Sequence, residues 1–194
     1  MTNYIWQAIA APHHVFSREE TKGKLAASVG VVTVAALLGS VGIPAVISAV
    51  RYVPEKPILD PVSMLLAFGA SVLSWLIVCL LFWALSCAFR NGLRFRQVLS
   101  VWGFSYVPNA LCVLLYGGLQ FLPNARVTSG IAAFLVGAAF LFLLVWKAIY
   151  YYLFLRCTMN VCLRELVLTV LSSAVVFAAL LWAGALAGIQ VPML

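Results

Sequence analysis

The stretch PVSMLLAFGASVLSWLIVCLLFWALSCAF, residues 61–89, contains no charged side chain over its 29 residues. A helix rises about 1.5 Å per residue and the hydrocarbon core of a bilayer is about 30 Å thick, so about 20 apolar residues cross it. The apolar residues are continuous and do not alternate with polar ones, as they would in a transmembrane β-strand. This stretch therefore predicts a membrane-spanning α-helix.

Four further runs of the same kind lie around it. Only 9% of the 194 residues are charged and 65% are hydrophobic, whereas ordinary globular domains are about 25% charged. We therefore expect an all-α polytopic membrane protein with one five-helix domain over residues 25–194. The five predicted spans lie near residues 25–50, 61–89, 97–122, 128–155 and 165–189.

Basic residues are distributed unequally between the connections. A cytoplasmic N-terminus puts eight Lys and Arg residues inside and three outside, which is the arrangement that the positive-inside rule favours. We therefore expect the N-terminus in and the C-terminus out. The inside set is Arg18, Lys22, Lys24, Arg90, Arg94, Arg96, Arg156 and Arg164, and the outside set is Arg51, Lys56 and Arg126.

Residues 1–24 form an expected cytoplasmic segment before the first span. The first apolar run begins only at Leu25, and no cleavable signal-peptide pattern precedes it. Apolar residues at helical spacing predict a short interfacial helix that ends near Pro12. Those residues are Ile5, Trp6, Ala8 and Ile9.

The net charge of +7 comes from bases that flank apolar runs. Attraction to anionic lipid and control of topology are the usual roles of such bases. The chain has no basic patch with interleaved aromatic residues on a hydrophilic surface. We therefore expect membrane lipids as partners and no nucleic acid.

Lys147 is the one charged side chain well inside a predicted span. A charge in the hydrocarbon region costs a few kcal/mol or more, which points to a role in contact with an ion, a lipid or a partner. The alternative is structural. If the hydrocarbon part of this span is 128–146, Lys147 lies near the cytoplasmic boundary and extends its ammonium group to water.

The third predicted span contains a proline in a polar setting. Pro108 has no N–H, so the carbonyl of Phe104 loses its helical partner and needs another one in lipid. Broken helices line the substrate sites of transporters, but proline kinks are also common in structural spans. The polar cluster at this kink consists of Ser105, Tyr106, Pro108 and Asn109.

Two pairs of small residues recur at four-residue spacing in the last two spans. Gly184 and Gly188 form a GxxxG pattern, and Ala133 with Gly137 forms a similar pair. Small residues allow close helix approach, which drives association in lipid. The pattern predicts packing or partner contact and does not distinguish a neighbour in the same chain from another subunit.

The sequence offers no constellation for catalysis. The five Asp and Glu residues lie at helix ends or in tails, and no His, Asp or Glu falls within a predicted span. Cys157 and Cys162 lack CxxC spacing, and His13 and His14 have no ligand partner at suitable spacing. We therefore expect no enzyme, and no catalytic, metal or cofactor site.

Three local features resemble the Yip1-type membrane proteins. IAAPHHVF (residues 9–16) is similar to the family's apolar-Pro-xxx-Phe segment before the first span. FRQVLSVWGFSYVP (residues 95–108) is similar to its basic loop followed by an aromatic-x-Pro third span. The third feature is Trp146 followed, after a polar turn, by RELV (residues 164–167) and a final apolar helix.

This resemblance implies five spans and a cytoplasmic N-terminus. Eukaryotic members act with small Rab-type GTPases in the secretory pathway and carry a longer N-terminal region. Only about 24 residues precede the first predicted span here, so the resemblance implies a prokaryotic-type member in a bacterial inner (plasma) membrane.

Three functions remain open from the sequence. The first is a non-enzymatic accessory or scaffold subunit that acts through helix–helix contacts with other membrane protein subunits. The second is a small transporter or channel-like protein that uses the Pro108 kink and Lys147. The third is a Rab-linked trafficking factor, which the family resemblance alone implies.

Overall fold

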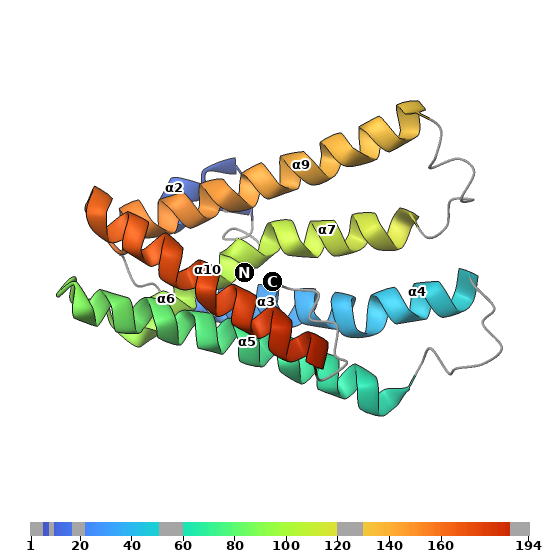
Figure 1. Ribbon diagram of the computed structural model, residues 1–194, viewed down its shortest axis with the longest axis horizontal. Helices are drawn as coiled ribbons and strands as arrows, with labels where there is room; N and C mark the ends of the chain where they lie inside the picture. The colour runs from blue at the N-terminus through green and yellow to red at the C-terminus, as the bar shows by residue number, and fades with distance from the viewer. Residues whose placement is uncertain (1–5, 8–9, 17–21, 51–59, 120–129, 187–194) are drawn as a thin grey trace.

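The computed structural model describes residues 6–7, 10–16, 22–50, 60–119 and 130–186 (Figure 1). Over these residues every regular element is a helix, and five helices are long and apolar enough to cross a membrane, which confirms the predicted all-α class. The five candidate spans are Lys24–Val46, Pro61–Ala88, Phe95–Leu119, Ala133–Thr158 and Leu163–Leu186. The inside and outside assignment stays a prediction.

Each span is built from one helix or from two joined by an irregular turn. A short helix, α2 (Pro12–Val15), precedes them. The elements of the spans are α3 (Lys22–Leu37), η1 (Leu38–Gly42), α4 (Ile43–Val50), α5 (Pro61–Ala88), α6 (Phe95–Trp102), η2 (Gly103–Ser105), α7 (Tyr106–Leu119), α9 (Gly130–Leu153), η3 (Phe154–Thr158) and α10 (Leu163–Leu186).

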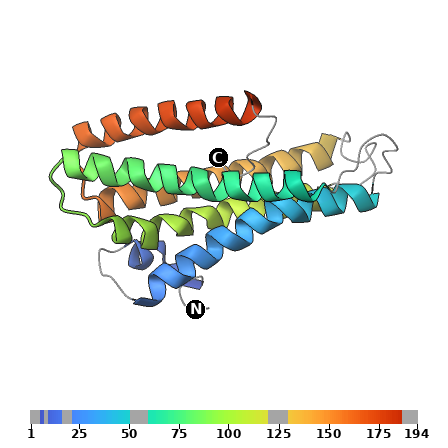
Figure 2. The same ribbon diagram turned by 90° about the horizontal axis from the view of Figure 1, so that it is seen from below.

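The long helices lie along one common axis, so the bundle has two ends (Figures 1 and 2). The turn from α5 to α6 and the turn from η3 to α10 lie at the same end. We call this the basic end, because its described residues include Arg90, Arg94, Arg96, Arg156 and Arg164.

Side chains and backbone geometry fix where the helices begin and end. Asp60 caps α5 by accepting hydrogen bonds from the backbone N–H groups of Val62 (3.3 Å) and Ser63 (3.1 Å). At the other end of α5, Arg90 adopts φ 56°, and the N–H of Asn91 donates to the carbonyl of Ser86, which is a Schellman-type ending.

Reciprocal caps begin two helices at the basic end. The side-chain oxygen of Gln97 accepts a hydrogen bond of 2.9 Å from the N–H of Arg94 at the start of α6. Glu165 accepts one of 2.9 Å from the N–H of Cys162 at the start of α10. Both caps satisfy N–H groups that have no partner within the helix, and the Glu165 carboxylate also suits the helix dipole.

Both prolines within the spans follow an interruption of the regular helix. The π-turn η1 precedes Pro44, and the 3₁₀ turn η2 precedes Pro108. Proline cannot supply the N–H that a regular α-helix needs at that position, and such local changes of helix type accommodate the loss. The predicted interruption of the third span is therefore present as a 3₁₀ turn.

An aromatic cluster forms the core near the basic end. The ring centroid of Phe82 lies 4.6 Å from that of Trp102 and 5.0 Å from that of Phe154, and Tyr151 lies 5.7 Å from Trp102. Tilted and edge-to-face pairs of this kind add about 0.5–1.5 kcal/mol each beyond area burial. The cluster joins α5, α6, α9 and η3.

The N-terminal segment docks onto this core. Val15 and Phe16 are fully buried, and the Phe16 ring lies 5.2 Å from that of Tyr150. The predicted interfacial helix lies partly outside the described residues, but Trp6, Gln7 and Ala10 are helical. Residues 12–16 therefore belong to the bundle, which the interfacial prediction did not anticipate.

Candidate intramembrane polar site

The predicted polar cluster of the third span lies inside the bundle. Ser105, Tyr106 and Asn109 are exposed by 1%, 4% and 8%, and Pro108 is also buried. The Ser105 Oγ has no hydrogen-bond partner among the described residues. The backbone break therefore faces protein and not lipid, as irregular backbone at membrane depth requires.

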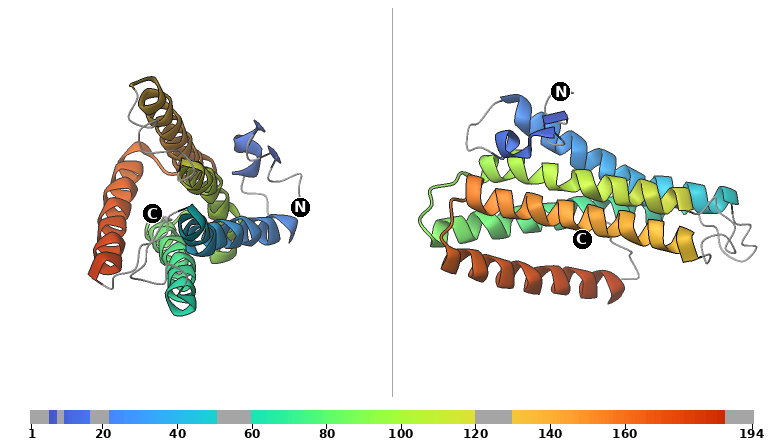
Figure 3. Two further views of the ribbon diagram at one scale, coloured as in Figure 1. Left: turned by 90° about the vertical axis from the view of Figure 1, so that its right-hand side faces the viewer. Right: turned by 90° about the horizontal axis from the view of Figure 1, so that it is seen from above.

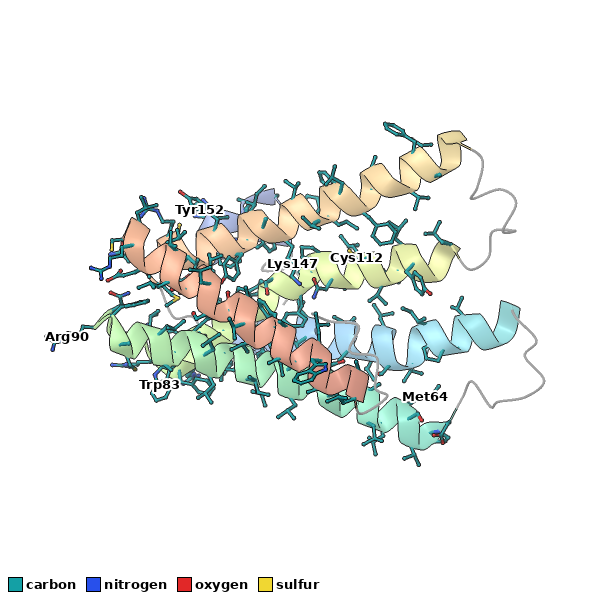
Figure 4. All side chains as sticks on the ribbon, viewed as in Figure 1. Met64, Trp83, Arg90, Cys112, Lys147 and Tyr152 are labelled. Atoms are coloured by element: carbon teal, nitrogen blue, oxygen red, sulfur yellow. The ribbon has the colours of Figure 1, made fainter. Side chains whose placement is uncertain are left out.

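Lys147 lies near the middle of the bundle. Nine residues, or about 13 Å of helix rise, separate it from Arg156 at the basic end. Figure 4 shows Arg90 at one end, and Lys147 beside Cys112 of α7 near the middle. That depth exceeds the reach of a four-carbon lysine stem, so this placement favours the interior interpretation of Lys147 over the boundary one.

The side of α9 that carries Lys147 faces α7 and α10. Lys147 is half-buried and lies close enough to Cys112 for an electrostatic interaction. Tyr151 lies one turn further along the same side of α9. Its hydroxyl group forms a hydrogen bond of 2.5 Å with the Ser173 hydroxyl group of α10.

The sequence provides no carboxylate within the spans to pair with Lys147. No Asp or Glu occurs between Asp60 and Glu165, and none occurs in residues 25–54 or 166–194. Asp60 caps the start of α5, and Glu165 caps the start of α10 at the basic end. Lys147 is therefore a basic group at membrane depth for which this chain carries no intramembrane acid.

The small-residue pairs lie on the surface or beyond the described residues. Ala133 and Gly137 are exposed, and a Cβ added at Gly137 would meet nothing within 4 Å. Gly184 is half-buried, while Gly188 lies outside the described residues. The Ala133–Gly137 side of α9 is therefore free of close packing against the described part of the chain.

Three contacts of this region were not found from the sequence. They are the close approach of Gly103 to Ser28, the Tyr151–Ser173 hydrogen bond, and the hydrogen bond of 2.6 Å that Thr158 Oγ1 donates to the carbonyl of Phe16. Thr169 and Ser173 are both buried and lie one turn apart in an otherwise apolar helix. This spacing was a sequence signal for an inward-facing polar side of α10.

The geometry offers binding groups and no recognisable reaction centre. Among the described residues, no three His, Cys, Asp or Glu side chains are grouped so that they could hold a metal ion. The site consists of one amine, hydroxyl groups and a thiol. Such groups can bind an anion or a polar group in lipid.

Comparison with known proteins produced no match: no family model fits the chain, and no curated protein or solved structure is similar to it at the level of a match.

Proposed function

We propose that this membrane protein is a non-enzymatic accessory or scaffold subunit that holds other membrane protein subunits through helix–helix contacts. One observation carries the proposal. In the most apolar 18-residue stretch of the third span 67% of the residues are buried, whereas the value is 11% for each of the last two spans. Two spans of a small bundle thus leave nearly all of their surface for lipid or for neighbouring helices.

The character of this surface also supports contact with other helices. Ala133 and Gly137 lie on the exposed side of α9, where small residues let another backbone approach. α10 packs mainly on α5 and diverges from α9 along its length (Figures 1 and 3). A helix from another subunit could therefore approach α9 from the side that α10 leaves uncovered.

Purification in a mild detergent, with mass analysis of co-eluting chains, tests the proposal. The variant Ala133→Leu/Gly137→Leu adds bulk to the exposed side of α9 and is expected to reduce co-elution while insertion is unchanged. Gly184→Leu/Gly188→Leu tests the GxxxG side of α10 in the same way. Ala179→Leu, on an exposed part of α10, is the control. A wild-type protein that elutes alone contradicts the accessory function.

A transporter or channel-like function is the second candidate. The 3₁₀ turn in the third span and the unpartnered Ser105 Oγ support it, because interrupted helices with polar groups occur at transport sites. Solute flux in reconstituted vesicles, lost in a Pro108→Ala/Ser105→Ala variant that still inserts, would favour this candidate over the accessory function.

The Yip1-type resemblance and a Rab-linked trafficking role stay predictions from the sequence, as does the bacterial inner membrane. Their support is limited to the segments 9–16, 95–108 and 164–167. Binding of a purified small GTPase to the reconstituted protein would test the trafficking role directly.

A further inference from the structure

The uncovered side of α9 carries Lys147 and continues onto exposed residues. Leu144 lies three residues before Lys147, on the same side of the helix, and is 65% exposed. In the other direction, Tyr151 bonds to Ser173 of α10. The surface beside Lys147 is therefore bounded by α10 near the basic end and is open toward Leu144.

α10 does not close this surface further along. It packs mainly on α5, its contact with α9 is slight, and the two helices diverge from η3 onward (Figure 1). Lys147 itself stays half-buried, beside Cys112 of α7 (Figure 4). Its ammonium group is thus close to the side from which a further helix could approach.

The depth and charge of Lys147 restrict what can pair with it. A lipid headgroup would have to enter about 13 Å below the level of Arg156 to reach it. A second copy of this chain has no Asp or Glu in its spans to offer. A carboxylate on the membrane helix of a different protein meets both conditions, and intramembrane charges are usually paired in this way.

We propose that the side of α9 bearing Lys147 and Leu144 receives a transmembrane helix of another protein, and that a Glu or Asp near the middle of that helix pairs with the Lys147 ammonium group. The inference rests on the proposed accessory function and adds the chemistry of the partner. The Tyr151–Ser173 hydrogen bond sets one boundary of the contact surface.

A synthetic helix tests the pairing directly. The probe is a Leu/Ala-rich transmembrane peptide of about 23 residues with one central Glu, compared with the same peptide carrying Gln. Energy transfer between labelled full-length protein and labelled peptide is measured in phosphatidylcholine vesicles. The Glu peptide is expected to bind about three- to tenfold more tightly than the Gln peptide.

The variants define the result that overturns the pairing. Lys147→Met should remove the difference between the Glu and Gln peptides, and Lys147→Arg should keep it, because only the second retains a charge. Equal binding of both peptides to the wild-type protein, or a preference for Glu that survives in Lys147→Met, overturns the inference.

Photo-crosslinking in native membranes separates this inference from the accessory function itself. With a photoreactive residue in place of Leu144, the expected product joins α9 to a membrane helix with a mid-span Asp or Glu, and Lys147→Met removes that product. Crosslinks to a helix without such an acid overturn the pairing but leave the accessory function standing. Crosslinks to lipid alone contradict both.

Discussion

Gly103 lies so close to Ser28 that no larger residue fits between the first and third spans. A Cβ at position 103 would lie 2.0 Å from the Ser28 Oγ and 2.8 Å from the Ser28 carbonyl oxygen. The same serine donates a hydrogen bond of 2.6 Å from its Oγ to the carbonyl of Leu99. The glycine and the serine together bring α3 against α6 and η2, at the break in the third span.

Gly103→Ala is therefore expected to destabilise the bundle. One obstructing atom belongs to the backbone, so a side-chain rotation cannot relieve the clash, and overpacking of this kind costs about 1–3 kcal/mol. Gly117→Ala is the matched control, since it is also a buried glycine of the third span but a Cβ there meets nothing within 4 Å. Thermal unfolding in detergent should show a lower midpoint for Gly103→Ala alone. Equal midpoints would contradict the close approach.

Thr158→Val should loosen the N-terminal segment. The Thr158 hydroxyl donates a hydrogen bond to the carbonyl of Phe16, and both residues are fully buried. Valine keeps the shape but leaves that carbonyl without this donor, at a cost of about 1–3 kcal/mol. Hydrogen exchange of residues 12–16 should become faster.

Thr169→Val is the control for that substitution. The Thr169 hydroxyl bonds to the carbonyl of Glu165 within its own helix, so its loss should leave exchange in residues 12–16 unchanged. If Thr158→Val also left it unchanged, the hydrogen bond would not hold the segment.

Asp60 should make the start of α5 sensitive to acid. The hydrogen bond from the Ser63 side chain, followed by that from the Ser63 backbone N–H, lowers the pKa of Asp60 below its ordinary value of 3.8. A carboxyl group whose pKa is lower in the folded state stabilises the protein above the unfolded value, and this stabilisation is lost as pH falls through the folded value. Unfolding midpoints followed from pH 7 downward should show the loss only below about pH 4.

Two substitutions separate charge from capping at Asp60. Asp60→Asn should keep a cap and remove the acid dependence that Asp60 contributes, because asparagine caps helices but does not titrate. Asp60→Ala should lose stability already at pH 7. An unchanged acid profile in Asp60→Asn would show that other groups cause the transition.

The sequence was sufficient to predict the spans because span length follows from bilayer thickness. The runs near residues 61–89 and 165–189 correspond closely to α5 and α10 in their described parts. The position of Lys147 within its span was harder to predict. The π-turn η3 extends the fourth span to Thr158, so Lys147 is central to a segment whose hydrocarbon part, in the boundary interpretation, was taken to end at residue 146.

The contacts between spans could not be predicted from local patterns. GxxxG and Ala133–Gly137 have the spacing of packing glycines, yet the closest described approach uses Gly103, which has no small partner four residues away. Its partner Ser28 lies in a helix 75 residues earlier, and only the three-dimensional arrangement brings the two together. The polar cluster at Pro108 was predictable because a missing N–H in lipid requires local polar groups.

Native cysteines allow a test of the predicted orientation without new residues at the basic end. Cys87, Cys157 and Cys162 are exposed and lie near that end. With the N-terminus in, they face the cytoplasm, so a membrane-impermeant maleimide should label them only in opened cells. Gly130→Cys lies at the start of α9, at the opposite end, where a Cβ meets nothing within 4 Å. That variant should be labelled in intact cells, and the reverse pattern would contradict the orientation that the eight-to-three distribution of bases predicts.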